Sequence, residues 1–194
     1  PDFSMYSFYS SVSENQVIAI QKLDSLKTDV DEVIKTANDN NVDMIIFSNP
    51  CNPTGQGITA EESRRLVKSV NALVILDEAY MDFWDQPVLQ EAAQYDNLIV
   101  LKTSSKAVGS AAIRLGFAVA NKTLTKALRA VKSPYNVNTL TQEIGTCIFS
   151  HKKLLTERRN TIVQNTKELY SKLLELKKTY SLPFNIYEPC TNFV

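Results

Sequence analysis

The segment LKTSSKAVGSAAIRLGF, residues 101–117, joins two apolar runs and holds two isolated cations, Lys106 and Arg114, among small and hydroxyl residues. A solvated surface segment would carry more charge, and a buried strand would carry larger side chains. Gly109 and the other small residues between the two cations let the backbone turn closely around a ligand. The segment therefore predicts a loop at a strand end that binds a ligand with one lysine and one arginine.

Apolar runs that are typical of buried strands lie on both sides of this segment and alternate with helical patterns. The strand patterns cover residues 16–23, 42–48, 72–77, 98–102 and 115–120, and helical patterns cover 29–40 and 59–70. Thr59 and Glu62 have the capping-box spacing. Continuous Val/Ile/Leu strands separated by helices predict an α/β fold, a mostly parallel sheet with helices on both faces in three α/β/α layers.

A different pattern runs from His151 to Tyr180, where neither Gly nor Pro occurs and apolar residues recur at helical spacing. This pattern predicts a long amphipathic helix, and residues 182–189 (LPFNIYEP) predict a new strand after it. We expect residues 1–150 to form a large domain that is incomplete at its N-terminus. We expect residues 151–194 to form a bridging helix and the truncated start of a small α+β domain. A first residue other than Met and a strand-like ending indicate a fragment of a longer protein.

The composition excludes several classes of function. Lys plus Arg and Asp plus Glu both number 21, so the charge gives no reason to expect nucleic acid or a membrane surface as a partner. No apolar run approaches the roughly 20 residues that cross a bilayer, and we expect no signal peptide. Three separated cysteines and one histidine argue against a disulfide framework and a metal site. The expected location is the cytoplasm.

Polar residues follow three of the predicted strands. They occur in NPCNPTG (49–55), DEAY (77–80) and TSSK (103–106), and Arg114 precedes the next strand. Ligands of open parallel sheets bind beyond the carboxyl ends of the strands. The sequence therefore predicts that an amide, a carboxylate, a phenol, hydroxyls and a lysine meet at one edge of the sheet.

Each of these residues also has a purely structural interpretation. NPTG alone is a turn, and Asp77 alone is a helix cap. Tyr80 and Phe3 alone are packing residues, and Lys106 alone is a surface lysine. The combination, and not any single residue, favours a ligand site.

The combination suits pyridoxal phosphate. A lysine amine forms a Schiff base with the cofactor's aldehyde, and an acidic partner holds the proton on its pyridine nitrogen. Lys106 supplies the amine and Asp77 the acidic partner. Asn52 and Tyr80 can donate hydrogen bonds to the ring oxygen. The phosphate needs hydroxyls and a planar cation that binds two oxygens at once. Those groups are carried by Thr103, Ser105 and Arg114.

The chain resembles the class I and II (fold type I) pyridoxal-phosphate aminotransferases, and within them the histidinol-phosphate branch. The matching segments are PDFSMY (1–6), SNPCNPTG (48–55), LDEAYMDF (76–83), TSSKAVGSAAIRLGFAVA (103–120), SPYNVNTLTQ (133–142) and TNFV (191–194). They keep the family's order and approximate spacing over essentially the whole chain.

The resemblance implies an aminotransferase that exchanges an amino group between histidinol phosphate, or a related amino acid, and 2-oxoglutarate. It implies that Lys106 bonds to the cofactor and moves a proton between the substrate's alpha carbon and the cofactor's aldehyde carbon. It places Asp77 at the pyridine nitrogen and Phe3 where the family stacks an aromatic residue, usually Tyr or Trp. The further implied contacts are Asn52 and Tyr80 with the ring oxygen, and Thr103, Ser105 and Arg114 with the phosphate. Lys106, Asp77 and Tyr80 form the implied catalytic set, and no metal is implied.

The resemblance also implies parts that this chain does not carry. A glycine-containing phosphate turn and a tyrosine that reaches across a homodimer are expected before Pro1, and the substrate-binding arginines after Val194. Two alternatives share the same cofactor cradle. One is a decarboxylase of the threonine-phosphate type. The other is a non-catalytic effector domain of a transcriptional regulator, which an upstream helix-turn-helix would identify.

Overall fold

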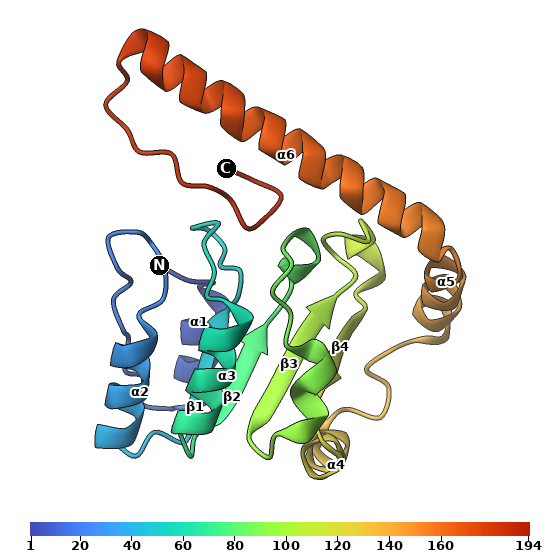
Figure 1. Cartoon of the computed structure of the whole chain (residues 1–194). Coiled ribbons are helices and arrows are strands. Elements are labelled where there is room, and N and C mark those ends of the chain that lie inside the picture. The colour runs from blue at the N-terminus through green and yellow to red at the C-terminus, as the bar shows by residue number, and fades with distance from the viewer.

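Four strands form one sheet in the computed structural model, which describes all 194 residues. The strands β1 (Met44–Ser48), β2 (Leu73–Asp77), β3 (Leu98–Thr103) and β4 (Gly116–Val119) lie in that order across the sheet. The first three are parallel, and β4 is antiparallel to β3. The pairing places Ser48 beside Asp77, and Asp77 beside Leu101. The carboxyl ends of the three parallel strands therefore reach one edge of the sheet (Figure 1).

Six α-helices and three short 3-10 helices accompany the sheet. They are α1 (Met5–Val12), α2 (Val30–Asp39), α3 (Ala60–Ser69), α4 (Lys122–Val131), α5 (Thr139–Ser150), α6 (Lys152–Tyr180), η1 (Met81–Phe83), η2 (Leu89–Gln94) and η3 (Ala111–Ile113). The predicted capping box is present, because Thr59 Oγ1 accepts the Glu62 N–H and the Glu62 carboxylate accepts the Thr59 N–H. Asp29 caps α2 with a single bond, in which its carboxylate accepts the Glu32 N–H. These caps satisfy backbone donors that a helix start leaves free.

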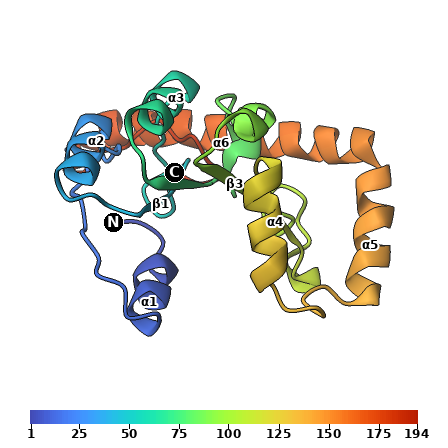
Figure 2. The same cartoon turned by 90° about the horizontal axis from the view of Figure 1, so that it is seen from below.

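The hydrophobic core lies between the sheet and one layer of helices. Val74 and Leu76 of β2 are fully buried, and Leu66 of α3 and Val33 of α2 pack in the same cluster. Helices α2 and α3 cover this face, whereas α1 lies on the other side of the sheet (Figure 2). The alternate residues of β2 are only half-buried. The predicted α/β fold with a mostly parallel sheet is confirmed.

The long helix α6 begins one residue after His151 and ends at Tyr180, as the sequence predicts. Its 29 residues correspond to a length of about 44 Å. It contacts η1 and α5, and it crosses the molecule above the carboxyl ends of the strands (Figure 1). Only Thr166 is buried in it. No helix has the length and hydropathy needed to cross a membrane.

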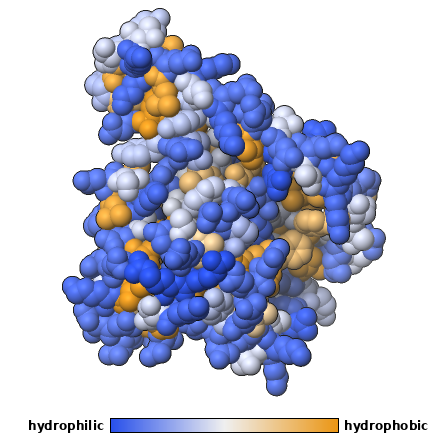
Figure 3. Space-filling view, viewed as in Figure 1, coloured by the Kyte–Doolittle hydropathy of each residue, from blue (hydrophilic) through white to orange (hydrophobic).

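Hydrophobic side chains on the surface form separate patches among hydrophilic ones (Figure 3). Leu154, Leu169 and Leu174 of α6 are exposed. No residue of helix α1 is fully buried, and Phe8, Tyr9 and Val12 are more than half exposed. The apolar stripes of α1 and α6 therefore have little to pack against within this chain.

Two predicted strands do not form. Residues 16–23 and 182–189 contain no strand, and Val17, Ile18 and Phe184 are exposed. A strand is stable only when its backbone groups pair with a neighbouring strand, and no such neighbour lies beside these segments. One hydrogen bond joins the second segment to the turn that follows the first, because the Tyr187 hydroxyl donates to the Asp24 carbonyl at 3.2 Å.

Candidate active site

The loop after β1 is held by an asparagine inside it. Asn49 is buried, its Oδ1 accepts the Ile58 N–H at 2.9 Å, and its Nδ2 donates to the Ile58 carbonyl at 3.1 Å. Gly55 has a φ of 69°, in the left-handed region that favours glycine. The two Asn49–Ile58 hydrogen bonds therefore close the loop that contains the predicted turn. This loop places Asn52 near the end of β2.

Asn52 and Tyr80 meet above the sheet edge. The Asn52 Nδ2 amide donates to the Tyr80 hydroxyl at 2.7 Å. Tyr80 is buried, and its ring packs edge-on against Phe193 with centroids 5.5 Å apart. The loops after β1 and β2 are thus joined by the two residues expected to contact the same cofactor oxygen.

Asp77 ends β2 with both carboxylate oxygens bonded. Its Oδ1 accepts the Ala79 N–H at 3.0 Å, and its Oδ2 accepts the Tyr6 hydroxyl at 2.8 Å. Burial, followed by the charge and hydrogen bond of Asp77, raises the pKa of Tyr6 well above its usual value. Tyr6 therefore stays protonated and acts as a donor.

Lys106 follows β3 in an exposed turn. Its Nζ lies over the Tyr80 ring, 5.1 Å from the ring centroid. A cation in this position is attracted by the negative face of the ring. The turn closes with the Gly109 N–H donating to the Lys106 carbonyl at 2.9 Å. Gly109 has a φ of 71°, which explains a glycine there.

The hydroxyl residues around Lys106 differ in their environments. Thr103 Oγ1 accepts the Ser105 N–H at 3.1 Å, which brings these two predicted phosphate ligands together. The Ser104 hydroxyl is fully buried and has no hydrogen-bond partner. Thr103 and Ser105 are therefore partly exposed, whereas Ser104 is buried between them.

Arg114 lies apart from Lys106 at the far end of the loop. It is exposed, its φ is 53°, and its Nη1 donates to the Ala111 carbonyl at 2.7 Å. No hydrogen bond joins it to Thr103 or Ser105 within the chain. Its remaining guanidinium donors are therefore available to an anion.

Phe3 packs against Tyr6, the residue that donates a hydrogen bond to Asp77. Its ring packs edge-on against Tyr6 with centroids 5.5 Å apart, and its side chain is 46% exposed. Asp2 fixes this segment, because its carboxylate accepts the Ser48 hydroxyl at the end of β1. The N-terminal segment therefore reaches the same sheet edge as the three strand ends.

The fold also brings to this edge three residues that the sequence motifs did not indicate. Tyr6 bonds Asp77, Phe193 packs on Tyr80, and Glu78 is fully buried beside Asp77. Tyr6 and Phe193 lie in segments that carry the family resemblance, but nothing in the linear sequence tells which residue they touch.

Glu78 stabilises the backbone under the site. Its Oε1 accepts the Val88 N–H at 2.9 Å, and its Oε2 has no partner. Burial raises the pKa of this carboxyl, which the Val88 N–H and the nearby Lys102 partly oppose. Lys102 pairs with Asp82 at 3.1 Å and donates to the Glu78 carbonyl at 3.3 Å.

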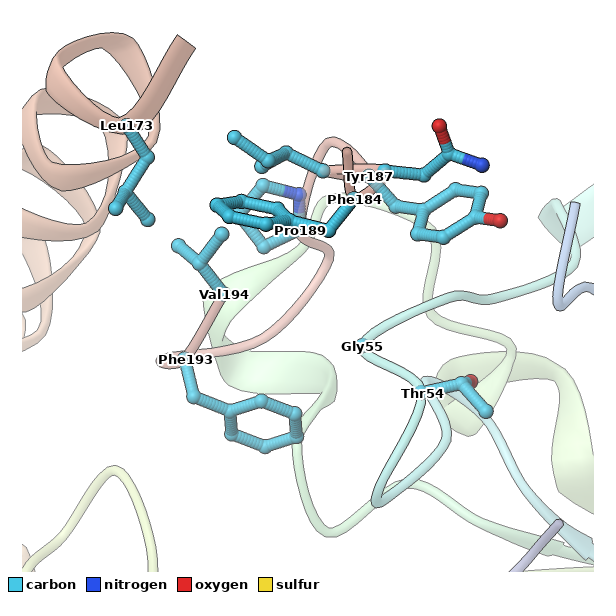
Figure 4. A pocket seen from close by; sticks show the side chains of 10 residues that line it. Thr54, Gly55, Leu173, Phe184, Tyr187, Pro189, Phe193 and Val194 are labelled. Carbon is cyan, nitrogen blue, oxygen red and sulfur yellow. The ribbon is translucent and has the colours of Figure 1, made fainter. Parts of the chain in front are cut away.

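A pocket of about 240 Å³ lies between α6, the Thr54–Gly55 turn and the C-terminal segment (Figure 4). Its lining is mostly apolar and includes Leu173, Phe184 and Phe193. Neither Lys106 nor Asp77 lines it. The pocket is therefore a neighbour of the polar cluster, which it meets where Phe193 contacts Tyr80.

Comparison with known proteins places the chain among described families. Residues 1–194 match the family "Aminotransferase class I and II". The chain is 41% identical over 194 residues to a histidinol-phosphate aminotransferase of Clostridium novyi (strain NT), covering 100% of this chain and 53% of that protein. The chain spans about half the length of the curated relatives it matches.

Two solved structures share the fold. The histidinol-phosphate aminotransferase from Sinorhizobium meliloti in complex with pyridoxal-5'-phosphate gives a TM-score of 0.86 at 17% identity, over 98% of this chain and 51% of that chain. The L-threonine-O-3-phosphate decarboxylase from Porphyromonas gingivalis gives a TM-score of 0.75 at 27% identity, over 89% and 52%.

Proposed function

The chain belongs to the family of class I and II aminotransferases, and from this premise we propose that the protein is a pyridoxal-phosphate-dependent aminotransferase of the histidinol-phosphate type. One observation carries the proposal. Asn52, Tyr80 and Lys106, which follow three different strands, form one contact chain at the sheet edge where Asp77 ends β2.

The side chains at this edge fit the groups of pyridoxal phosphate. When bound, the cofactor supplies a protonated pyridine ring that withdraws electrons from the substrate's alpha carbon. Asp77 would hold the proton on the ring nitrogen, and Asn52 and Tyr80 would donate to the ring oxygen. Phe3 contributes an aromatic side chain beside the ring. Thr103, Ser105 and Arg114 would bind the phosphate through hydroxyl and guanidinium donors.

Lys106 performs the covalent and proton-transfer work. Its Nζ is the amine that would hold the cofactor through its aldehyde. The same amine, when free, would take the proton from the substrate's alpha carbon. The Tyr80 ring lies under Nζ and holds the amine near the ends of the parallel strands.

The substrates that we propose are histidinol phosphate, or a related amino acid, and 2-oxoglutarate. The 41% identity to a histidinol-phosphate aminotransferase supports this choice over the decarboxylase type, for which the solved relative has 27% identity. An effector domain without turnover would keep the same lysine, and an upstream helix-turn-helix in the whole protein would identify it.

We also infer the organisation of the whole protein. Residues 1–150 belong to a cofactor-binding large domain, and residues 151–194 bridge to a small domain. A homodimer would cover the exposed Phe8, Tyr9 and Val12 of α1. Three free cysteines are compatible with action in the reducing cytoplasm.

The test is a titration of the protein, in the form in which the cell makes it, with pyridoxal phosphate. Borohydride reduction and peptide mapping should then locate the bound cofactor on Lys106. The loaded protein should form glutamate from histidinol phosphate and 2-oxoglutarate. Release of carbon dioxide from threonine phosphate, without glutamate formation, would instead identify the decarboxylase.

A further inference from the structure

The hydroxyl of Tyr6 is the one side-chain donor to Asp77. It reaches Oδ2 at 2.8 Å across a separation of 71 residues. The other oxygen, Oδ1, accepts the backbone N–H of Ala79 at 3.0 Å. A carboxylate has about four acceptor sites, so these two bonds fix its orientation and still leave it able to accept another donor.

Tyr6 is itself fixed in place by the segment that carries it. Its ring packs edge-on against Phe3, and its carbonyl accepts the Ser10 hydroxyl at 2.8 Å. Asp2, four residues earlier, binds the Ser48 hydroxyl and pairs with Lys22 at 3.7 Å. Because Ser48 is the strand neighbour of Asp77, the anchor of the segment lies next to the carboxylate that Tyr6 contacts.

Tyr6 also keeps its proton. Burial of its hydroxyl, together with the negative charges of Asp77 and Asp2, raises its pKa above the usual tyrosine value. A hydroxyl that stays protonated beside a carboxylate can only donate to it, and a donated hydrogen bond favours the charged form of the carboxylate.

We propose that Tyr6 is a positioning residue for Asp77: its hydroxyl holds the carboxylate charged and oriented so that the cofactor's ring nitrogen keeps its proton. The proposal rests on the proposed function, because the ring nitrogen belongs to pyridoxal phosphate. Without the Tyr6 donor, the proton shared between ring nitrogen and carboxylate moves towards Asp77, and the ring withdraws electrons less strongly.

The test uses pyridoxal phosphate labelled with ¹⁵N in its ring and bound to the wild type, to Tyr6→Phe and to Tyr9→Phe. Tyr6→Phe removes the hydroxyl and keeps the ring that packs on Phe3. Tyr9→Phe removes a hydroxyl from the same helix at an exposed position. The ring-nitrogen resonance should lie in the protonated range for the wild type and Tyr9→Phe, and move towards the neutral range for Tyr6→Phe. The dissociation constant of the cofactor should rise about tenfold for Tyr6→Phe only, which corresponds to one hydrogen bond to a charged group.

Asp77→Asn supplies a second variant, so that the test does not rest on the Tyr6→Phe variant alone. In that background, Tyr6→Phe should leave the ring-nitrogen resonance where Asp77→Asn has put it, because the two residues act through one contact. A wild type that loads cofactor and a Tyr6→Phe variant with an unchanged resonance would overturn the proposal and leave the proposed function intact. A wild type that binds no cofactor on Lys106 would overturn both.

Discussion

The Nζ atom of Lys106 lies 5.1 Å from the centroid of the Tyr80 ring, so a lysine after β3 rests on a tyrosine after β2. Tyr80 in turn accepts a hydrogen bond from Asn52 after β1. The three strand ends are therefore linked by side chains in the absence of any ligand. Such preorganisation lowers the cost of ordering the site when a cofactor binds.

Lys106→Ala should abolish the borohydride-reducible adduct with pyridoxal phosphate, because the variant lacks the amine that forms it. Lys106 is exposed, so the free energy of unfolding should change by no more than about 0.5 kcal/mol. Mass spectrometry after reduction measures the adduct, and exposed Lys126 provides the control as Lys126→Ala. An adduct that persists at full yield in Lys106→Ala would exclude the assigned role.

Asp77→Asn should retain bound cofactor but slow the transfer of the amino group by at least about a hundredfold, since the ring nitrogen loses its charged partner. The asparagine oxygen can still accept a hydrogen bond from Tyr6 or Ala79. Stopped-flow absorbance with the amino donor measures the half-reaction, and the exposed Asp85→Asn is the control. A half-reaction near the wild-type rate counts against Asp77.

Arg114→Gln should weaken the binding of pyridoxal phosphate by about 10- to 100-fold, the usual worth of a hydrogen bond to a charged group. Binding of pyridoxal, which lacks the phosphate, should hardly change. Fluorescence titration measures both constants, with Arg129→Gln as the control. Equal weakening for the two compounds would indicate a structural role for Arg114.

Glu78→Gln should change how stability depends on pH. Burial raises the pKa of Glu78 above its ordinary value of 4.5, so folding favours the protonated form. The stability that this group contributes is complete below the unfolded pKa and is lost as the pH rises through the folded pKa. Urea unfolding between pH 4 and pH 8 should therefore show Glu78→Gln gaining on the wild type as the pH rises. A constant difference would mean that Glu78 titrates alike in both states.

Gly57→Ala should destabilise the loop that carries Asn52. An added Cβ would lie 2.5 Å from a ring carbon of Trp84 and 2.8 Å from Asn49 Oδ1. Overpacking of this kind costs about 1–3 kcal/mol of unfolding free energy, which urea denaturation measures. Gly116→Ala, whose Cβ would meet only the Lys102 carbonyl at 3.2 Å, should cost less. A larger loss of unfolding free energy for Gly116→Ala than for Gly57→Ala would show that the Trp84 side chain moves aside freely.

Local patterns in the sequence were sufficient for the elements whose signals are local. The Thr59 capping box, the strands β1 to β4 and the long helix from Lys152 to Tyr180 formed where they were expected, because caps, apolar runs and helical periodicity act over a few residues. The mostly parallel sheet was also predicted, and in it Asn52 and Tyr80 meet at the edge where the strands end.

The tertiary structure alone decided the contacts between distant residues. A tyrosine in α1 bonds Asp77 across 71 residues, and no spacing in the sequence encodes that pair. The apolar residues 16–23 and 182–189 remained without strand structure, because a strand depends on a neighbour with free backbone groups and not on its own side chains. The sequence by itself determined which chemical groups stand at the strand ends. The fold decided which of them touch, since hydrogen bonds and ring contacts depend on distances that only packing sets.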